Sequence, residues 1–255
     1  MIVIDSWFGR LGNNILQILR SIHFAIINNH NCIKFESHRM LCTREIKINS
    51  INSNNSNTSI IKDTFFYLKK KHNIDDPEPY IMKKYFQTYI KPIFKIPLIN
   101  NNLHNNNEIY VHFRGGDIFS FNPHKAYVQP PLSYYKNIIT DYNIVKLVCE
   151  DTKNPCINEL LKQENVYYTS NTLEKDLSIL SNASNLIIGF GTFGFLLYLM
   201  NPCLKNLYIP KYFVDELPKG SWGDDIKIHV VELPNYIKVG EWKFNEEQKK
   251  IMLEY

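Results

Sequence analysis

Residues 109–117 read Ile-Tyr-Val-His-Phe-Arg-Gly-Gly-Asp, an apolar run that ends in two glycines and an acidic residue. The apolar run predicts a buried β-strand, and the glycine pair predicts a loop at the carboxyl end of that strand. Side chains alternate along a strand, so His112 and Arg114 point the same way. Open parallel sheets bind their ligands at this end of their strands. The stretch therefore predicts both a strand of a parallel sheet and a candidate ligand site.

After this stretch, strand and helix patterns alternate as far as residue 209, and residues 245–255 predict a closing helix. Pro131 fits a helix start, because proline at the first helical position gives up no bonded amide. Strands that alternate with helices indicate an α/β fold with a parallel, doubly wound sheet. The expected strands are 144–149, 166–168, 186–188 and 207–209, and the expected helices begin at 132 and cover 158–164, 173–181 and 193–200.

The residues before this stretch predict a first lobe with the same alternation. Residues 2–4 predict a strand, and the apolar spacing from Ile15 to Ile26 predicts a helix. Residues 99–108 contain seven Asn or His among ten residues, which predicts a linker. We therefore expect two domains, residues 1–105 and 106–255. Within the first, we expect a strand at 32–35, a loop at 49–59 and helices at 64–73 and 79–90.

Composition limits the classes of function. With 44% hydrophobic and 13% aromatic residues, the chain is unlike disordered proteins, and it has no apolar stretch of about 20 residues to span a membrane. A net charge of +4 with dispersed lysines and arginines does not indicate nucleic acid binding. The first residues lack the pattern of a secretory signal, so we expect a cytoplasmic protein.

The five cysteines predict reduced thiols. They are odd in number and have no CxxC spacing, so they indicate neither a zinc site nor a disulfide framework. A bridge between Cys149 and Cys156 remains an alternative.

The first segment with possible chemistry is Gly-Arg-Leu-Gly-Asn-Asn at residues 9–14, between a predicted strand and a predicted helix. Glycines let the backbone approach a ligand, and the first turn of a helix offers unpaired amides to an anion. An ordinary strand-to-helix turn is the alternative. Arg10 and Asn13 favour a ligand, because a simple turn does not need them.

The second segment is residues 112–117. The Arg114 guanidinium can hold a phosphate by two parallel hydrogen bonds and stabilise the negative charge of a leaving diphosphate. Asp117 can orient a neighbouring basic group or brace the turn. An Arg114–Asp117 ion pair that only holds a loop is the alternative.

The third segment, Gly-Phe-Gly-Thr-Phe-Gly at residues 189–194, matches the dinucleotide fingerprint G-x-G-x-x-G. Dinucleotide folds place this motif in their first strand-helix unit, with an acidic residue at the end of the next strand. Here Asp215 comes several residues after that strand. We therefore interpret the segment as a phosphate cradle made of backbone amides and the Thr192 hydroxyl, and dinucleotide binding is the less favoured alternative.

In their order along the chain, these segments resemble motifs of the inverting fucosyltransferases of the α1,2, α1,6 and protein-O types, which use GDP-fucose, and the α1,2 family most of all. The chain differs from the family pattern at Asn14, which stands for Gln, at Gly115, which stands for a second Arg, and at Gly191-Thr192, which stand for Ser-Ser. The similar segments are 9–14 to G-R-L-G-N-Q, 112–117 to H-x-R-R-x-D, 131–135 to P-L-x-Y-Y, and 176–193 to D-L…I-I-x-N-S-S-F.

The resemblance implies a GT-B-like fold of two Rossmann-like lobes with parallel sheets, the first on the acceptor side and the second holding GDP-fucose. It implies that Arg114 contacts the β-phosphate, and that Lys125 or Arg10 compensates for the missing arginine. It also implies a metal-independent enzyme with GDP-fucose as donor substrate and no further cofactor. The remaining donor-binding residues that it implies are Gly9, Arg10, Gly12 and Asn13 of the first lobe, Ser170 and Asn171 near the nucleoside, and Gly191, Thr192 and Phe193 at the diphosphate.

The resulting hypothesis is an inverting transfer of fucose to a glycan hydroxyl. Arg114, Asp117, His124 and His112 are the candidate catalytic residues, and the last three are candidates for a general base. The alternatives are a transferase for another nucleotide sugar, an inactive carbohydrate- or nucleotide-binding homologue, and a dinucleotide-dependent oxidoreductase. The aromatic residues that can stack on sugar rings, unless they are core residues, are Trp7, Phe8, Tyr127 and Tyr134.

Overall fold

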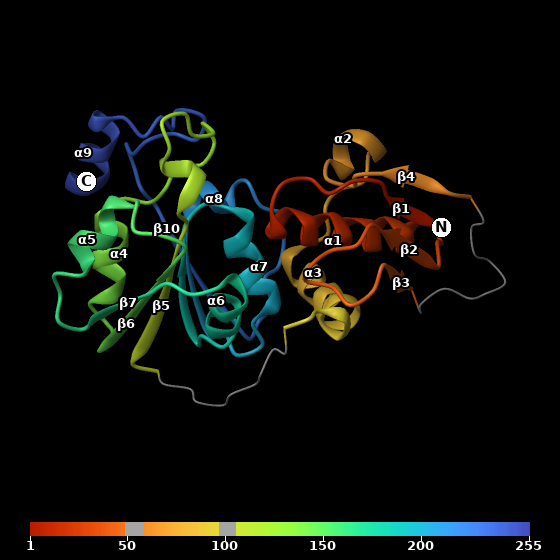
Figure 1. Cartoon of the computed structure of the whole chain (residues 1–255), viewed down its shortest axis with the longest axis horizontal. Helices are drawn as coiled ribbons and strands as arrows, with labels where there is room; N and C mark the ends of the chain where they lie inside the picture. Colours follow the sequence, from red (N-terminus) through yellow and green to blue (C-terminus); the bar gives the residue numbers. More distant parts are fainter. Residues whose placement is uncertain (49–58, 97–105) are drawn as a thin grey trace. The chain divides into compact units, whose positions relative to one another are not determined.

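The computed structural model describes residues 1–48, 59–96 and 106–255, which form two compact α/β units (Figure 1). The first unit is Met1–Pro97 with Pro218–Gly223, and the second is Leu98–Leu217 with Asp224–Tyr255. The sequence predicted a single boundary near residue 105. It did not predict that residues 218–223 belong to the first unit. The predicted loop at 49–59 and linker at 99–108 lie mostly outside the described residues.

The first unit contains a four-stranded sheet in the order β3-β2-β1-β4. Its central strand β1 pairs in parallel with β2 and β4, whereas β3 pairs with β2 in antiparallel orientation. Helix α1 follows β1 and buries an apolar face that includes Ile15, Ile18 and Ile22. The elements are β1 Ile2–Ile4, α1 Leu11–Ile27, β2 Cys32–Phe35, β3 Glu45–Lys47, β4 Ile61–Asp63, α2 Leu68–His72, α3 Pro79–Tyr85, a π-helical turn Phe86–Ile90 and a 3₁₀ turn Lys91–Ile93.

The helix predicted over residues 64–73 is wrong in its first half. Residues 64–67 are not helical, and Phe65 has a φ of +53°, a left-handed conformation that interrupts a right-handed helix. Only Leu68–His72 form the helix α2. The short strands β3 and β4 were not predicted, because each has a single apolar residue among its three, whereas the equally short β1 is wholly apolar.

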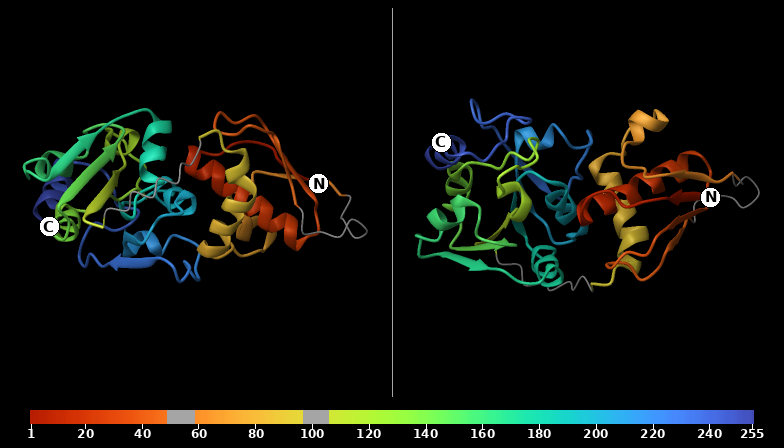
Figure 2. Two further views of the ribbon diagram at one scale, coloured as in Figure 1. Left: turned by 90° about the horizontal axis from the view of Figure 1, so that it is seen from below. Right: turned by 45° about the horizontal axis from the view of Figure 1, so that its top comes forward.

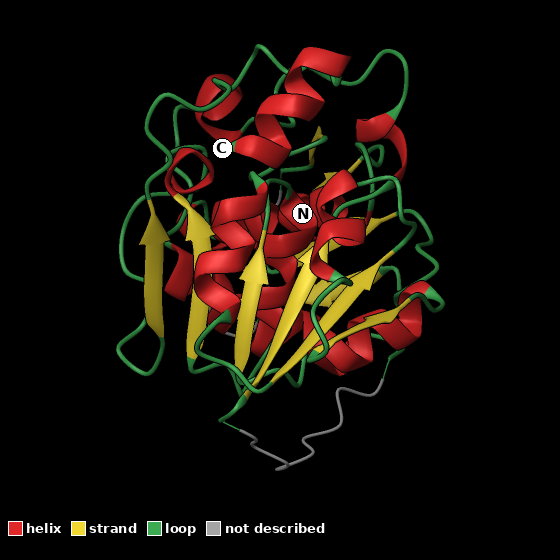
Figure 3. Cartoon of the chain, turned by 90° about the vertical axis from the view of Figure 1, so that its left-hand side faces the viewer, coloured by secondary structure: helices red, strands yellow, loops and turns green. Residues whose placement is uncertain are grey.

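The second unit contains a six-stranded sheet in the order β10-β9-β8-β5-β6-β7, and all its strand pairs are parallel. In Figure 3 the arrows of these strands point in the same general direction, so their carboxyl ends lie on the same side of the unit. From β5 the chain moves outward to β6 and β7, and then returns to place β8 on the other side of β5. The strand order therefore reverses between β5 and β8, as in doubly wound sheets. The strands are β5 Glu108–Phe113, β6 Ile144–Cys149, β7 Val166–Thr169, β8 Asn185–Ile188, β9 Asn206–Pro210 and β10 Lys227–Val231.

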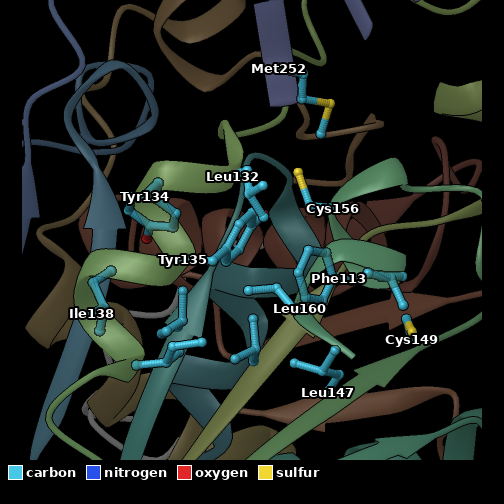
Figure 4. Close-up of a cluster of buried hydrophobic side chains, with 14 of the residues drawn as sticks. Phe113, Leu132, Tyr134, Tyr135, Ile138, Leu147, Cys149, Cys156, Leu160 and Met252 are labelled. Atoms are coloured by element: carbon cyan, nitrogen blue, oxygen red, sulfur yellow. The ribbon is translucent and has the colours of Figure 1, made fainter. Parts of the chain in front are cut away.

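Helices cover both faces of this sheet (Figures 1 and 2). Helices α4, α5 and α9 pack against one another, and α6 packs against β6. Figure 4 shows the buried cluster between α4 and the sheet, where the rings of Phe113 and Tyr135 lie 4.4 Å apart. The helices are α4 Leu132–Ile139, α5 Pro155–Leu160, α6 Leu173–Leu180, α7 Thr192–Met200, α8 Lys211–Val214 and α9 Glu246–Glu254, with a 3₁₀ turn at Gly116–Phe119.

The structure confirms an α/β fold with two mainly parallel sheets, although β3 pairs with β2 in antiparallel orientation. In the second unit it shifts one predicted helix. The helix expected at 158–164 begins earlier, at Pro155, because the Asn154 side chain accepts a hydrogen bond from the Cys156 backbone amide and caps that turn. All five cysteines are free, so the alternative of a Cys149–Cys156 bridge is wrong. In the described part of the chain, every helix is too short or too polar to cross a membrane.

Candidate functional site

Arg114 and Gly191 lie together at the point where the strand order reverses. Strands β5 and β8 are neighbours, with His112 opposite Ile188, so the loops that follow them begin side by side. Gly191 has φ of +137° and ψ of 147°, a conformation that essentially only glycine adopts. A Cβ atom at Gly191 would lie 2.7 Å from Arg114 Nη1. The guanidinium therefore rests directly against the backbone of the glycine loop.

Two side chains lie beside Arg114. Its Cζ atom lies 4.0 Å from the centroid of the Tyr127 ring, a cation–π contact. Its Nη2 atom lies 3.8 Å from Asp117 Oδ1, too far for a direct hydrogen bond. The Asp117 side chain is 52% exposed, against 18% for Arg114. An ion pair this open contributes little to stability.

His112 lies under this cluster and is neutral. Its ring packs against Phe193, with the centroids 4.8 Å apart. Burial, and then the nearby Arg114 charge, lower the pKa of His112 to about 3. At neutral pH the imidazole is therefore uncharged.

The glycine loop leads into α7, a nine-residue helix that begins at Thr192. Its first amides lie at the carboxyl end of β8, where a helix start favours negative charge. Gly194 matters for packing, because a Cβ atom there would lie 3.1 Å from the Ile188 Cβ. Its missing side chain lets the helix pack closely on its own strand.

The dinucleotide fingerprint is in an unusual place. It follows β8, the fourth strand of its sheet in chain order, whereas β5, the first, leads into a long loop before α4. The strand after the motif ends at Pro210, and Asp215 follows α8. This position agrees with the phosphate-cradle interpretation and disfavours the oxidoreductase alternative.

Gly115 stands where the resemblance leads one to expect a second arginine. A Cβ atom at Gly115 would lie 2.7 Å from Asp151 Oδ1. The Asp151 carboxylate also accepts hydrogen bonds from the backbone amides of Gly116 and Lys153, both at 3.0 Å. The carboxylate thus occupies the space that a side chain at position 115 would need.

The remaining predicted residues of this unit differ in their surroundings. His124 is exposed, and its Nδ1 accepts a hydrogen bond from the Ala126 amide, so the neutral ring carries its proton on Nε2. Lys125 is also exposed. Tyr134 is wrong as a sugar-stacking residue, because it is buried and its hydroxyl donates to the Ile188 carbonyl oxygen.

Ser170 and Asn171 lie after β7, two strands away from β5. Ser170 Oγ donates to the Glu150 carbonyl oxygen, and Asn171 Nδ2 donates to the side chains of Thr169 and Asp176. Their hydrogen-bond partners among the described residues thus lie after β6, at the end of β7 and in α6. They are not part of the Arg114 cluster.

In the first unit, the segment 9–14 forms the turn from β1 to α1. Gly9 has a φ of +71°, Arg10 is exposed beside the first turn of α1, and Gly12 is buried within that turn. A Cβ atom at Gly9 would overlap with Asn13 Nδ2. The turn is therefore tight, and Arg10 is its exposed charge.

Two buried amides fix this turn, and only one of them lies in the predicted motif. Asn14 Nδ2 donates to the Phe8 carbonyl oxygen. Gln17 accepts from the Phe8 amide and donates to the carbonyl oxygens of Ser6 and Thr64. Gln17 was missed, although a polar residue on the apolar face of a predicted helix was a signal for it.

Comparison with models of protein families, with curated proteins and with solved structures finds no match for this chain.

The Arg114 cluster has the chemistry of an anion site: one guanidinium, the amides at the start of α7 and a neutral imidazole at one edge of a parallel sheet. Sequence reasoning placed Arg114 and Gly191 at the ends of two strands but missed Asp151. The available signal was the position of Asp151 two residues after the strand 144–149. No group of three or more His, Cys, Asp or Glu that could hold a metal ion occurs among residues 1–48, 59–96 and 106–255.

Proposed function

We propose that this protein is a glycosyltransferase whose second unit holds the diphosphate of a nucleotide sugar. The observation that carries the proposal is the contact of Arg114 with Gly191 at the point of strand reversal. Ligands of doubly wound sheets bind at that point. A diphosphate there has the guanidinium on one side and the first amides of α7 on the other.

The reaction needs this arrangement at the moment when the sugar departs. The acceptor hydroxyl oxygen forms a bond to the anomeric carbon, and the bond from that carbon to the diphosphate oxygen breaks. The leaving diphosphate keeps the electron pair, and Arg114 stabilises the charge that builds up on it. The hydroxyl proton passes to a general base.

Asp117 is the favoured candidate for that base. His112 is half-buried with its ring against Phe193, so it is less open to an acceptor than the exposed Asp117. His124 uses its acceptor nitrogen for the Ala126 amide. The Asp117 carboxylate is half exposed and within 3.8 Å of Arg114, so an acceptor that reaches the diphosphate also reaches this carboxylate.

Fucose and guanosine are proposed from the resemblance of four segments to the GDP-fucose-dependent family. A GT-B arrangement, with Gly9, Arg10 and Asn13 facing the donor, belongs to the same proposal. Thermal shifts with GDP, UDP and ADP separate this donor from other nucleotide sugars, and a shift with NAD(H) alone would favour the oxidoreductase. Binding of GDP-fucose without hydrolysis or transfer would favour an inactive homologue.

The decisive test is Arg114→Ala, assayed with GDP-fucose and a glycan panel by mass spectrometry. We expect transfer to fall about a hundredfold or more, as for the loss of one preorganised charge-stabilising donor. Arg44→Ala, an exposed arginine of the first unit, is the matched control and should keep full activity. Near-normal turnover by a folded Arg114→Ala protein would refute the role of Arg114.

A further inference from the structure

Gln129 lies beneath the Arg114 cluster and connects its two loops. The side chain is completely buried. Its Nε2 atom donates to the carbonyl oxygens of Tyr127 at 3.2 Å, Val128 at 3.4 Å and Phe190 at 3.3 Å. Tyr127 carries the ring on which Arg114 stacks, and Phe190 directly precedes Gly191. One amide group thus links Tyr127, on whose ring the Arg114 guanidinium stacks, to the glycine loop.

The surroundings of Gln129 leave this amide little freedom. Its backbone carbonyl oxygen accepts a hydrogen bond of 2.9 Å from the hydroxyl of Tyr236, which is itself buried. A Cβ atom at Gly189 would lie 2.9 Å from Gln129 Oε1, so the glycine loop packs directly on the amide. The link is therefore short, buried and fixed at both ends.

The orientation of the amide follows from its neighbours. Three carbonyl oxygens face Nε2, and an exchange of nitrogen and oxygen would place an acceptor against all three. Among the described residues, Oε1 has no hydrogen-bond partner. Hence Gln129 joins the two loops through its N–H groups and not through Oε1.

We infer that Gln129 is a positioning residue of the diphosphate site, which sets the spacing between the Arg114 guanidinium and the amides of residues 191–193. This inference rests on the proposed function. A diphosphate must contact both groups at once, so a change in their spacing weakens its binding even when each group is intact. Gln129 touches neither the diphosphate nor the sugar in this role.

The first test is Gln129→Met, which keeps the length of the side chain and removes the donors. We expect GDP binding, measured by calorimetry, to weaken about tenfold or more. Asn201→Leu is the matched control, because Asn201 is also completely buried and also donates to two carbonyl oxygens, those of Leu180 and Ala183, at the other end of α7. It should lose stability and keep its affinity for GDP.

The second test is Gln129→Glu, which keeps the volume and makes the link depend on pH. A carboxylate facing three carbonyl oxygens is repelled, whereas a protonated carboxyl group can donate to one of them. The affinity of this variant for GDP, relative to the unchanged protein, should therefore rise as the pH falls from 8 to 5. A ratio that stays constant would overturn the inference, and this variant also carries the test if Gln129→Met does not fold.

Hydrogen exchange separates a failure of this inference from a failure of the proposed function. We expect faster exchange in residues 120–131 and 189–195 of Gln129→Met but not of Asn201→Leu, whether or not a nucleotide binds. If the unchanged protein binds neither GDP nor pyrophosphate, the proposed function fails. If it binds GDP and Gln129→Met has the same affinity and the same exchange, the proposed function stands and Gln129 is not a positioning residue.

Discussion

Gly191 and Gly240, both in the second unit, have positive φ angles but very different surroundings. Gly191 has a φ of +137°, and a Cβ atom there would meet Arg114. Gly240 has a φ of +97°, and a Cβ atom there would have no other atom of the described residues within 4 Å. Both positions therefore favour glycine for the backbone conformation. Only at Gly191 would a side chain also displace a group of the candidate site.

This difference allows the strain of the backbone to be separated from the loss of the site. Gly191→Ala and Gly240→Ala should each lower the free energy of unfolding by about 1–3 kcal/mol, because alanine is strained at these angles. Only Gly191→Ala should also weaken GDP binding, about tenfold or more, since its methyl group moves the Arg114 guanidinium. Equal GDP affinities in the two variants, measured by calorimetry, would contradict the placement of Arg114.

At the scale of the elements, one carboxylate joins a strand to a helix in the first unit. Asp63 is the last residue of β4 and is buried. It accepts hydrogen bonds from the Lys71 ammonium group, from His72 Nε2 and from the Thr64 amide. Burial by itself raises the pKa of Asp63, but these three donors outweigh it and hold the pKa below its ordinary value. Helix α2 has only five residues and is too short to be stable alone, so it needs tertiary contacts such as this one.

Asp63→Asn should therefore destabilise the protein in a way that depends on pH. We expect a loss of about 1–3 kcal/mol at pH 7, because Lys71 and His72 lose a charged partner. A folded-state pKa below the unfolded value means that the contribution of Asp63 is complete above about pH 4 and disappears as the pH falls through the folded pKa. The stability difference between the two proteins, measured by urea unfolding, should thus shrink below about pH 4.

Asp75→Asn is the control for this pH series. Asp75 pairs with Lys69 in the same segment, but it is 84% exposed. An exposed pair contributes little. Two results would disagree with the role given to Asp63. One is a stability difference between the unchanged protein and Asp63→Asn that widens toward low pH, and the other is the same pH dependence for Asp75→Asn.

The elements that the sequence predicted correctly are those with long or fully apolar patterns. Strand β5 and helix α1 are examples, because burial repeats along them with a clear period. Strand β10 was missed because Lys227 and His229 interrupt its apolar residues at the edge of the sheet. Phe65 gave no signal of its left-handed angle, since that conformation depends on tertiary packing.

The candidate site was predictable in its parts but not in its assembly. Arg114 and Gly191 were each placed after a strand by local pattern. Their contact depends on β8 returning to pair with β5, which no local pattern specifies. The links made by Tyr127, Gln129 and Asp151 depend on the same pairing or on the neighbouring strand β6, so they emerge only from the folded chain.

At the scale of the whole molecule, residues 218–223 leave the second unit and complete the first. The Ser221 carbonyl oxygen accepts a hydrogen bond from the Tyr80 amide in the first turn of α3, and the Ser221 amide donates to Glu78 Oε2. Gly220 has a φ of +117°, and a Cβ atom there would overlap with Glu78 Cγ. The segment thus satisfies an amide at a helix start that no side chain caps.

Gly220→Ala should disturb the first unit although residue 220 lies far along the chain. We expect faster hydrogen exchange at the start of α3, because the methyl group displaces Glu78 and loosens the segment. Exchange in β5 and β8 should not change. Gly240→Ala again serves as the control for backbone strain, and unchanged exchange at Tyr80 in Gly220→Ala would argue against a stabilising role of the segment.

The course of the chain also limits how this protein can be recombined with others. Because the polypeptide enters and leaves the first unit near residues 97, 217 and 223, a single genetic crossover cannot exchange one unit for its counterpart. A chimera joined only near residue 97 would combine a foreign amino-terminal segment with the native residues 218–223, and α3 would then contact a segment that did not evolve with it. Functional hybrids therefore require residues 218–223 to be exchanged together with the rest of the first unit.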